Sequence, residues 1–278
     1  MKHLIAIILT TFVHAQPSWL TIHGSRQFSI SGVASFENGF LVVHDNKKMK
    51  QPRLSYLDSS FKLRKLIWPE TNLPYDLEAL HLMPGFANKF VAMESTGKAY
   101  IFLVDPFDFR IEILSTITLP GISNKMNLEG FAVFQSAQGT VFIYGDRGSN
   151  KRKSTLITAF FDPQNNKIDT IEKFIIDLPI PEKSKRNIAD IAIDKNGAVW
   201  TVATSDPGNN GPFKSAIYQI GHLNNVGTFN YNHPDLLKPL IVIDEQKIEA
   251  MMFKDNELVL MTDNENNGSS YFSIKEAF

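Results

Sequence analysis

The chain of 278 residues contains no cysteine. This absence excludes a disulfide framework, a thiolate nucleophile, a cysteine-ligated zinc site and a lipidated cysteine anchor. An excess of one charge is also missing, since 28 Lys and Arg face 29 Asp and Glu, which gives a formal net charge of -1. Bulk electrostatics therefore favours no nucleic acid or other polyanion as a partner.

Long hydrophobic runs are scarce as well. Only Leu4–Val13 is extended and apolar, and it is too short to cross a bilayer, which takes roughly 20 residues. Lys2 precedes this run, and Val13-His14-Ala15 supplies small residues at the expected cleavage position. We predict a signal peptide at 1-15 and a mature domain at 16-278, with a buried N-terminal strand as the alternative.

These features favour an exported protein that is secreted or periplasmic. The lack of disulfides is more typical of a bacterial periplasm or exterior than of a eukaryotic secretory route. We expect no membrane insertion of the mature chain and a monomeric state. Walker, Gly-x-Ser-x-Gly and His-Glu-x-x-His motifs are all missing, so no common catalytic signature identifies a reaction.

A sustained helical period is absent too, and short β-branched or alternating runs separated by Gly, Asn, Asp and Pro take its place. Five segments in this pattern resemble one another. Each opens with a small or acidic residue at the start of an apolar strand, and a second apolar strand follows after a loop. The segments begin at Ser31, Glu78, Glu129, Asp190 and Glu249, at intervals of 47 to 61 residues.

This spacing matches a four-stranded propeller blade with insertions. We therefore predict an all-β fold, a single β-propeller with five blades, while six blades or a β-sandwich remain alternatives. Third strands are expected at Leu54–Leu57, Ala99–Val104, Ser154–Phe161, Ser215–Ile220 and Ser270–Ile274, and fourth strands at Leu63–Trp68, Ile111–Leu119, Lys173–Leu178 and Leu237–Ile243. The fifth repeat ends after its third strand, so Ser18–His23 is expected to supply its missing outer strand and close the ring.

The first strand of every propeller blade lines the central channel, so equivalent residues of different blades face one another. Four carboxylates and a hydroxyl would thereby form a ring at Ser31, Glu78, Glu129, Asp190 and Glu249. Acids this close must either raise their pKa values or share a cation. Hard oxygen ligands in a wide ring favour Ca²⁺, and Mg²⁺ less so. The alternative is that these residues only accept backbone hydrogen bonds at strand starts.

A second polar layer follows the second strands and is expected at one mouth of the channel. We predict that Asp45 or Asp146 orients water and that Arg147 balances developing negative charge. Residues predicted to contact the substrate are His44, Glu94, Arg152, Asp206 and Asp263. Polar turn residues of β-proteins offer a purely conformational explanation for the same layer.

The segments Ile30-Ser31-Gly32-Val33, Leu77-Glu78-Ala79, Leu128-Glu129-Gly130 and Ile248-Glu249-Ala250 resemble the soluble calcium-activated nucleotidases, or apyrases. They also look like the exported phytase-like esterase and SdiA-regulated propellers. The resemblance implies a five-bladed propeller with Ser and Glu residues around an axial Ca²⁺. Asp190 departs from the nucleotidase pattern, which has Ser there, and the basic and aromatic nucleotide-binding segments are not evident.

Two functions follow from these patterns. One is an exported calcium-dependent hydrolase of phosphoesters or other small esters. The other is a non-catalytic propeller that binds a small anionic molecule or a protein partner around a structural axial metal. Propellers carry out both kinds of function, so the fold alone does not choose between them.

Overall fold

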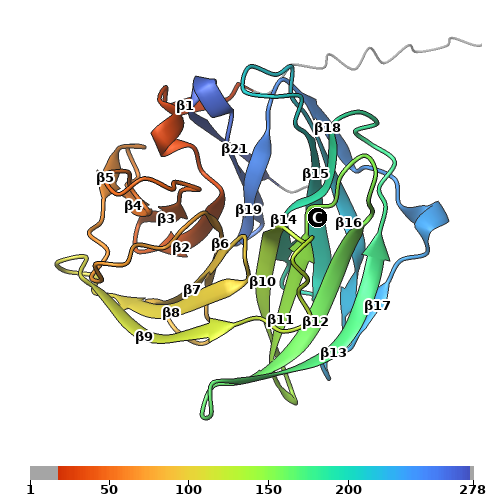
Figure 1. The fold of residues 1–278 in the computed structure, drawn as a ribbon, viewed down its shortest axis with the longest axis horizontal. Coiled ribbons are helices and arrows are strands. Elements are labelled where there is room, and N and C mark those ends of the chain that lie inside the picture. Colours follow the sequence, from red (N-terminus) through yellow and green to blue (C-terminus); the bar gives the residue numbers. More distant parts are fainter. Residues whose placement is uncertain (1–17, 276–278) are drawn as a thin grey trace, which may run out of the picture.

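Five antiparallel sheets surround a central axis in the computed structural model, which describes residues 18–275 (Figure 1). Each sheet has four strands from axis to rim, and the fourth sheet has one more. The chain is therefore an all-β, five-bladed propeller, as predicted, and the six-bladed and sandwich alternatives are wrong. The predicted signal peptide, 1-15, lies outside the described residues.

The blades follow one another along the chain. Blade 1 consists of β2 (Gly32–Phe36), β3 (Gly39–Val43), β4 (Leu54–Leu57) and β5 (Leu63–Lys65). Blade 2 consists of β6 (Leu77–Leu82), β7 (Lys89–Glu94), β8 (Lys98–Val104) and β9 (Ile111–Thr118). Blade 3 consists of β10 (Leu128–Ser136), β11 (Gly139–Asp146), β12 (Ser154–Asp162) and β13 (Lys167–Ile176).

Blade 4 is the one that departs from the expected plan. Its strands are β14 (Lys185–Ile193), β15 (Ala198–Ser205), β16 (Lys214–Leu223), β17 (Phe229–Tyr231) and β18 (Ile241–Asp244). Both short outer strands pair with β16, at opposite ends of it. The sequence predicted one fourth strand at Leu237–Ile243, and the structure divides this outer position between two strands. The extra strand accounts for part of the long interval between repeats.

Blade 5 closes the ring. It consists of β19 (Ile248–Lys254), β20 (Glu257–Thr262), β21 (Ser269–Lys275) and β1 (Leu20–His23). The N-terminal strand β1 pairs antiparallel with β21, with Leu20 opposite Tyr271. The predicted closure by an N-terminal strand is thus confirmed, and it covers a sheet edge that would otherwise be exposed.

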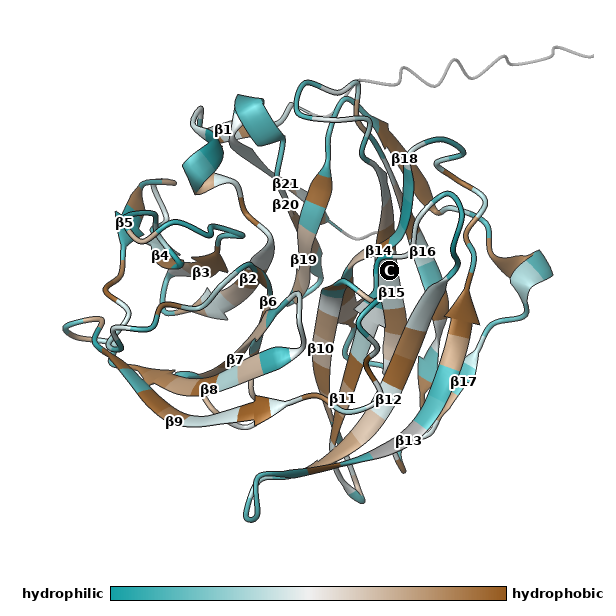
Figure 2. Ribbon diagram, in the orientation of Figure 1, coloured by the Kyte–Doolittle hydropathy of each residue, from teal (hydrophilic) through white to brown (hydrophobic). Residues whose placement is uncertain are grey.

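The hydrophobic core is divided among the spaces between blades. Five clusters of buried apolar side chains lie between blades 1 and 2, 2 and 3, 3 and 4, 4 and 5, and 5 and 1. Figure 2 shows brown, hydrophobic segments along inner, middle and outer strands of the propeller. Gly32 shows how closely the inner strands approach, since a Cβ there would lie 2.6 Å from the backbone nitrogen of Leu80.

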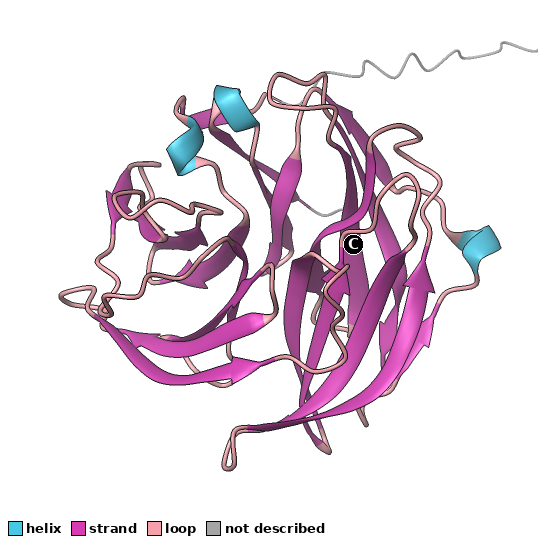
Figure 3. Cartoon of the chain, viewed as in Figure 1, coloured by secondary structure: helices cyan, strands magenta, loops and turns pink. Residues whose placement is uncertain are grey.

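In the described part of the chain, helical structure is limited to three 3₁₀ turns, η1 (Arg26–Phe28), η2 (Pro234–Leu236) and η3 (Glu265–Asn267), drawn in cyan in Figure 3. Within residues 18–275, no helix is long and apolar enough to cross a membrane.

Candidate functional site

β-Bulges place three glutamates at the start of inner strands. The strand register shifts between Leu77 and Ala79, between Leu128 and Gly130, and between Ile248 and Ala250. The extra residue in each bulge is one of the predicted ring members, Glu78, Glu129 and Glu249. A bulge redirects its extra side chain away from the regular pleat. Repeated at the same point of three blades, it brings carboxylates together at the axis.

Blade 4 has a different residue at this position. Asp190 is the first residue of β14 to pair after the register shift, as Ala79, Gly130 and Ala250 are in their strands, so Asp190 follows the shift and does not lie within it. The predicted alignment of the fourth repeat is therefore displaced by one residue. The cause is local, because Ile188-Ala189-Asp190 offers an acid one position late.

Asp190 stabilises the junction of three inner strands. Its Oδ1 accepts a hydrogen bond from the backbone of Ile191 at 2.8 Å, and its Oδ2 accepts one from Met251 in blade 5 at 2.6 Å. The backbone N–H of Phe131 in blade 3 is a further donor. Burial raises the pKa of Asp190 well above its usual value, and these bonds oppose that shift. The described hydrogen bonds of Asp190 therefore connect the inner strands of blades 3, 4 and 5.

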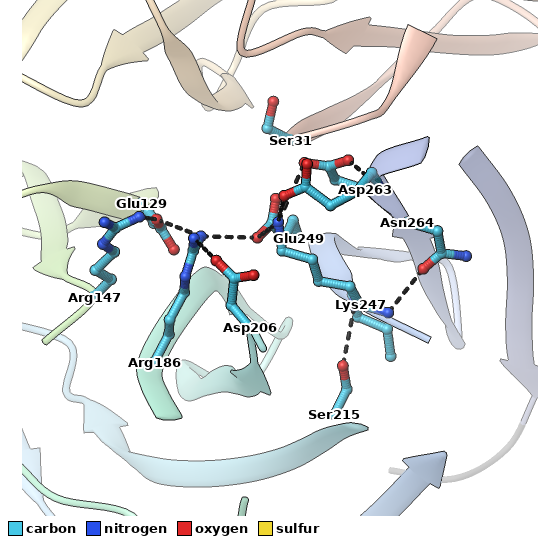
Figure 4. A network of polar contacts seen from close by, with 12 residues as sticks. Ser31, Glu129, Arg147, Arg186, Asp206, Ser215, Lys247, Glu249, Asp263 and Asn264 are labelled. Carbon is cyan, nitrogen blue, oxygen red and sulfur yellow. Dashed lines mark hydrogen bonds and ion pairs between the residues drawn. The ribbon is translucent and has the colours of Figure 1, made fainter. Parts of the chain in front are cut away.

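A guanidinium lies where the sequence predicted a metal ion. The Nη1 of Arg186 is 2.9 Å from Glu129 Oε1 and 3.2 Å from Glu249 Oε1, and its Nη2 pairs with Asp206 (Figure 4). The side chain of Arg186 is only 16% exposed. Its pKa is raised because Glu129, Glu249 and Asp206 together outweigh the cost of burial.

Lys247 provides a second internal cation. Its Nζ lies 3.0 Å from Glu249, 3.4 Å from Asp263 and 2.6 Å from Glu265, and the side chain is 2% exposed. Burial would lower the pKa of Lys247, but the surrounding carboxylates reverse the effect and raise it. Burial alone would raise the pKa of Asp263, yet Lys247 and hydrogen bonds lower it overall.

Two carboxylates on the side of blades 1 and 2 lack such partners. Among the described residues, Asp45 and Glu78 form no hydrogen bond or ion pair, although nearby charges act on both. Burial, followed by the charges of Asp263 and Asp76, raises the pKa of Asp45 to about 7. Burial, followed by repulsion from Glu129 and Asp76, raises the pKa of Glu78 well above its usual value. These two carboxylates therefore differ from Glu129 and Glu249, which bind Arg186.

The remaining ring member, Ser31, donates a hydrogen bond from its Oγ to the carbonyl of Leu77 at 3.0 Å. The described residues contain no group of three or more His, Cys, Asp and Glu placed to hold a metal ion. Arg186 and Lys247 bind Glu129 and Glu249 directly, so the complete ring does not fit the donor set predicted for Ca²⁺.

Two of the predicted mouth residues form an ion pair in which the acid is buried and the Arg152 side chain is 36% exposed. Asp146 is fully buried and binds Arg152 through both carboxylate oxygens, one of them at 2.9 Å. It also accepts a hydrogen bond from the backbone of Asn127 at 2.9 Å. These bonds hold the start of β10 and the turn after β11, and they occupy the carboxylate predicted to orient water.

His44 and Glu94 are similarly engaged. His44 is fully buried between the Ser29 carbonyl at 2.6 Å and Ser55 Oγ at 2.9 Å, and burial lowers its pKa to about 4. Glu94 accepts hydrogen bonds from the backbone of Tyr75 at 2.9 Å and from the Tyr100 hydroxyl at 2.6 Å. In contrast, the predicted residues Asp45, Arg147, Asp206 and Asp263 belong with the ring glutamates to one network of charges.

Sequence reasoning missed the two internal cations. Both carry a signal that could have identified them, because Arg186 lies at the start of the inner strand β14 and Lys247 lies just before the inner strand β19. Arg186 ends the basic run Lys183-Ser184-Lys185-Arg186, and Lys247 immediately precedes Ile248-Glu249. The opposite charges of these flanking residues and of the repeated acids predict pairing once the axis is known.

Comparisons with known proteins show the fold. No family model and no curated protein matches the sequence. A solved arabinanase from Bacillus subtilis has a TM-score of 0.54 and 12% identity, covering 92% of this chain and 96% of its own. A GH43 endo-arabinanase from Bacillus licheniformis has a TM-score of 0.52 and 10% identity, covering 90% and 94%.

An exo-1,5-alpha-L-arabinanase from a bovine ruminal metagenomic library is similar to the same extent, with a TM-score of 0.53, 11% identity, and coverage of 88% and 92%. These structures share the five-bladed architecture over nearly the whole chain. They are arabinanases, and the comparisons give no support to the predicted relation with apyrases or phytase-like propellers. At such low identity the similarity extends to the fold and no further.

Proposed function

We propose that this protein is an exported hydrolase of small anionic esters, phosphoesters among them, and that it acts at the channel mouth. The observation that carries the proposal is the pair Asp45 and Glu78, two channel carboxylates with raised pKa values and no bonding partner in the described chain. Acids with shifted pKa values near a cleft are typical of catalytic sites.

The two carboxylates suit the two proton transfers of hydrolysis. Asp45, with a pKa of about 7, is available in both protonation states near neutral pH. In the proposed reaction Asp45 accepts a proton as water attacks the phosphorus or acyl carbon. Glu78, whose pKa is raised well above its usual value by burial, gives its proton to the leaving oxygen as the ester bond breaks. Arg147 would balance the negative charge that develops meanwhile.

Turnover of a panel of substrates by the wild-type protein and by an Asp45 variant tests this proposal. Phosphomonoesters, nucleotides and aryl esters are offered near pH 7, and Asp45→Asn is expected to lower kcat/KM about 100-fold, as the loss of a general acid–base group does. The matched control is Glu112→Gln, which removes an exposed carboxylate on the outer strand β9. Full activity of Asp45→Asn would refute the role assigned to Asp45.

The second candidate is a propeller that binds an anionic molecule or a protein without turning it over. It is favoured by the structural engagement of Asp146, Arg152, His44 and Glu94, which leaves few groups free for chemistry. A ligand that raises Tm while every ester stays intact would support this second function. The same measurement thus separates the two functions.

Calcium remains a separate prediction with its own test. Metal analysis of the purified mature protein, and turnover or Tm with EGTA and after Ca²⁺ is restored, give the answer directly. If calcium is absent and EGTA changes neither quantity, the internal cations Arg186 and Lys247 are sufficient to compensate the channel acids.

A further inference from the structure

A basic hollow lies beside the axial network, between blades 3 and 4. Its volume is about 390 Å³, which is within the range of pockets that hold small ligands. Arg147, Lys151, Lys185 and Arg186 line it, and Asp206 is the single acid in its lining. Asp206 already pairs with Arg186, so the lining presents an excess of positive charge.

The walls of the hollow are held in place by the backbone. The turn after β11 closes through reciprocal hydrogen bonds between Ser149 and Arg152, at 2.7 and 3.1 Å. Gly148 has a φ of +68°, and a Cβ there would lie 2.8 Å from the Arg152 carbonyl. Across the hollow, the backbone N–H of Lys185 donates to Asn150 Oδ1 at 2.6 Å. A pocket that is formed before the ligand arrives loses less entropy on binding.

Two of the four cations have donors to spare. Lys151 is exposed, and among the described residues its ammonium has no hydrogen bond or ion pair. Arg147 uses Nη1 to bind Glu129 at 2.9 Å, and its other guanidinium N–H groups have no partner in the described chain. The fork of an arginine and a nearby ammonium are the groups that proteins use to bind phosphoryl oxygens.

We infer that this hollow binds the phosphoryl group of a small phosphorylated molecule, with Arg147 and Lys151 as the direct donors. The inference rests on the proposed function, since it names the class of anionic ester and the place where its charge is held. Lys185 and Arg186 are already engaged and contribute long-range attraction. The phosphoryl group would then lie next to the channel that contains Glu129 and Glu249.

Calorimetry with phenylphosphonate tests the inference independently of catalysis, because the carbon–phosphorus bond of this probe is not hydrolysed by an esterase. We expect saturable 1:1 binding to the full mature chain and none of the uncharged benzyl alcohol. Lys151→Gln is expected to weaken binding about tenfold, the effect of losing one charge-assisted hydrogen bond. Lys151→Glu reverses an exposed charge without touching the core and is expected to abolish binding.

The control is a second basic hollow of similar volume, about 370 Å³, which includes Arg64, Lys65 and Arg110 in its lining. Lys65→Gln should leave phenylphosphonate binding unchanged. Equal losses in the Lys65 and Lys151 variants, or binding that ignores Lys151→Glu, would overturn the inference. Phosphonate binding without turnover of any ester would uphold it and refute the hydrolase. Ester turnover that Lys151→Glu leaves unchanged, in a protein that does not bind phenylphosphonate, would refute the inference about the hollow and uphold the hydrolase.

Discussion

The single side chain of Arg186 contacts carboxylates from three parts of the propeller: Glu129 in blade 3, Glu249 in blade 5 and Asp206 after β15 of blade 4. A buried network of this kind depends on every member, since removing one partner leaves the others charged and poorly solvated. The residue therefore acts on the junction of blades as well as on the electrostatics of the channel.

Arg186→Met should consequently destabilise the fold by about 3 to 5 kcal/mol at pH 7, the usual cost of breaking a buried ion pair from one side. The loss should shrink towards pH 4, because burial raises the pKa of Glu249 and a proton can neutralise this carboxylate once the guanidinium is gone. Urea denaturation at both pH values measures this. Arg110→Met, an exposed change on another surface, serves as the control and is expected to cost less than about 0.5 kcal/mol. An equal loss of unfolding free energy in both variants would show that the contacts of Arg186 do not stabilise the fold.

Asp45 differs from Arg186, because its ionised side chain lowers the stability of the folded protein. Its pKa rises from 3.8 to about 7 on folding, so between these values the folded state retains a proton that the unfolded chain has lost. Stability contributed by this group therefore falls as pH rises from about 4 to about 7. Asp45→Asn should stabilise the protein by on the order of 1 to 3 kcal/mol at pH 8 and leave it unchanged at pH 4. Thermal unfolding across this range checks the sign, and a gain independent of pH would contradict it.

The residue scale is also where sequence reasoning reached its limit. The repeated Glu78, Glu129 and Glu249 were recognisable because each follows a buried aliphatic residue and precedes Ala or Gly. Asp190 matched them in charge but lies one position later, and only the pairing of Asp190 with Val202 shows the displacement. Arg186 lies outside the repeat entirely, and its path to the axis depends on the irregular backbone before Asp190.

At the scale of elements, strands were predictable because alternating or β-branched runs stand between turn residues. Third strands such as β4 and β8 lie where the sequence placed them, within a residue. The outer strand of blade 4 was harder to predict. β17 has only three residues and β18 four, so neither carries enough periodicity to be distinguished from a loop.

The closing strand β1 allows a prediction about elements. A chain that begins at Gly24 lacks Leu20–His23 and exposes the edge of β21, whose backbone groups then lose their partners. We expect a lower Tm and association of chains at the bare edge. Size-exclusion chromatography and thermal unfolding measure both effects, with a chain that begins at Ser18 as the control. A monomer with unchanged Tm would show that β1 is dispensable.

At the scale of the whole molecule, five apolar clusters between blades account for the propeller, while the proposed function depends on its polar centre. Repetition made the ring predictable, since each blade buries its faces against two neighbours. The same repetition gave no information about substrate. The residues that differ between blades, such as Arg186 in blade 4 and Asp45 in blade 1, give the centre its chemistry.

The closure of the ring also determines how the molecule would respond to force. Leu20 lies opposite Tyr271 and His23 opposite Ser269. The N-terminal end of β1 and the C-terminal end of β21 therefore lie at the same end of the paired strands. Tension that separates the two ends would load the hydrogen bonds of this pair one after another, as in opening a zipper. A shear geometry would load them all at once and resist more. Traction on the ends should therefore detach β1 first and open the propeller at blade 5 before the other blades separate.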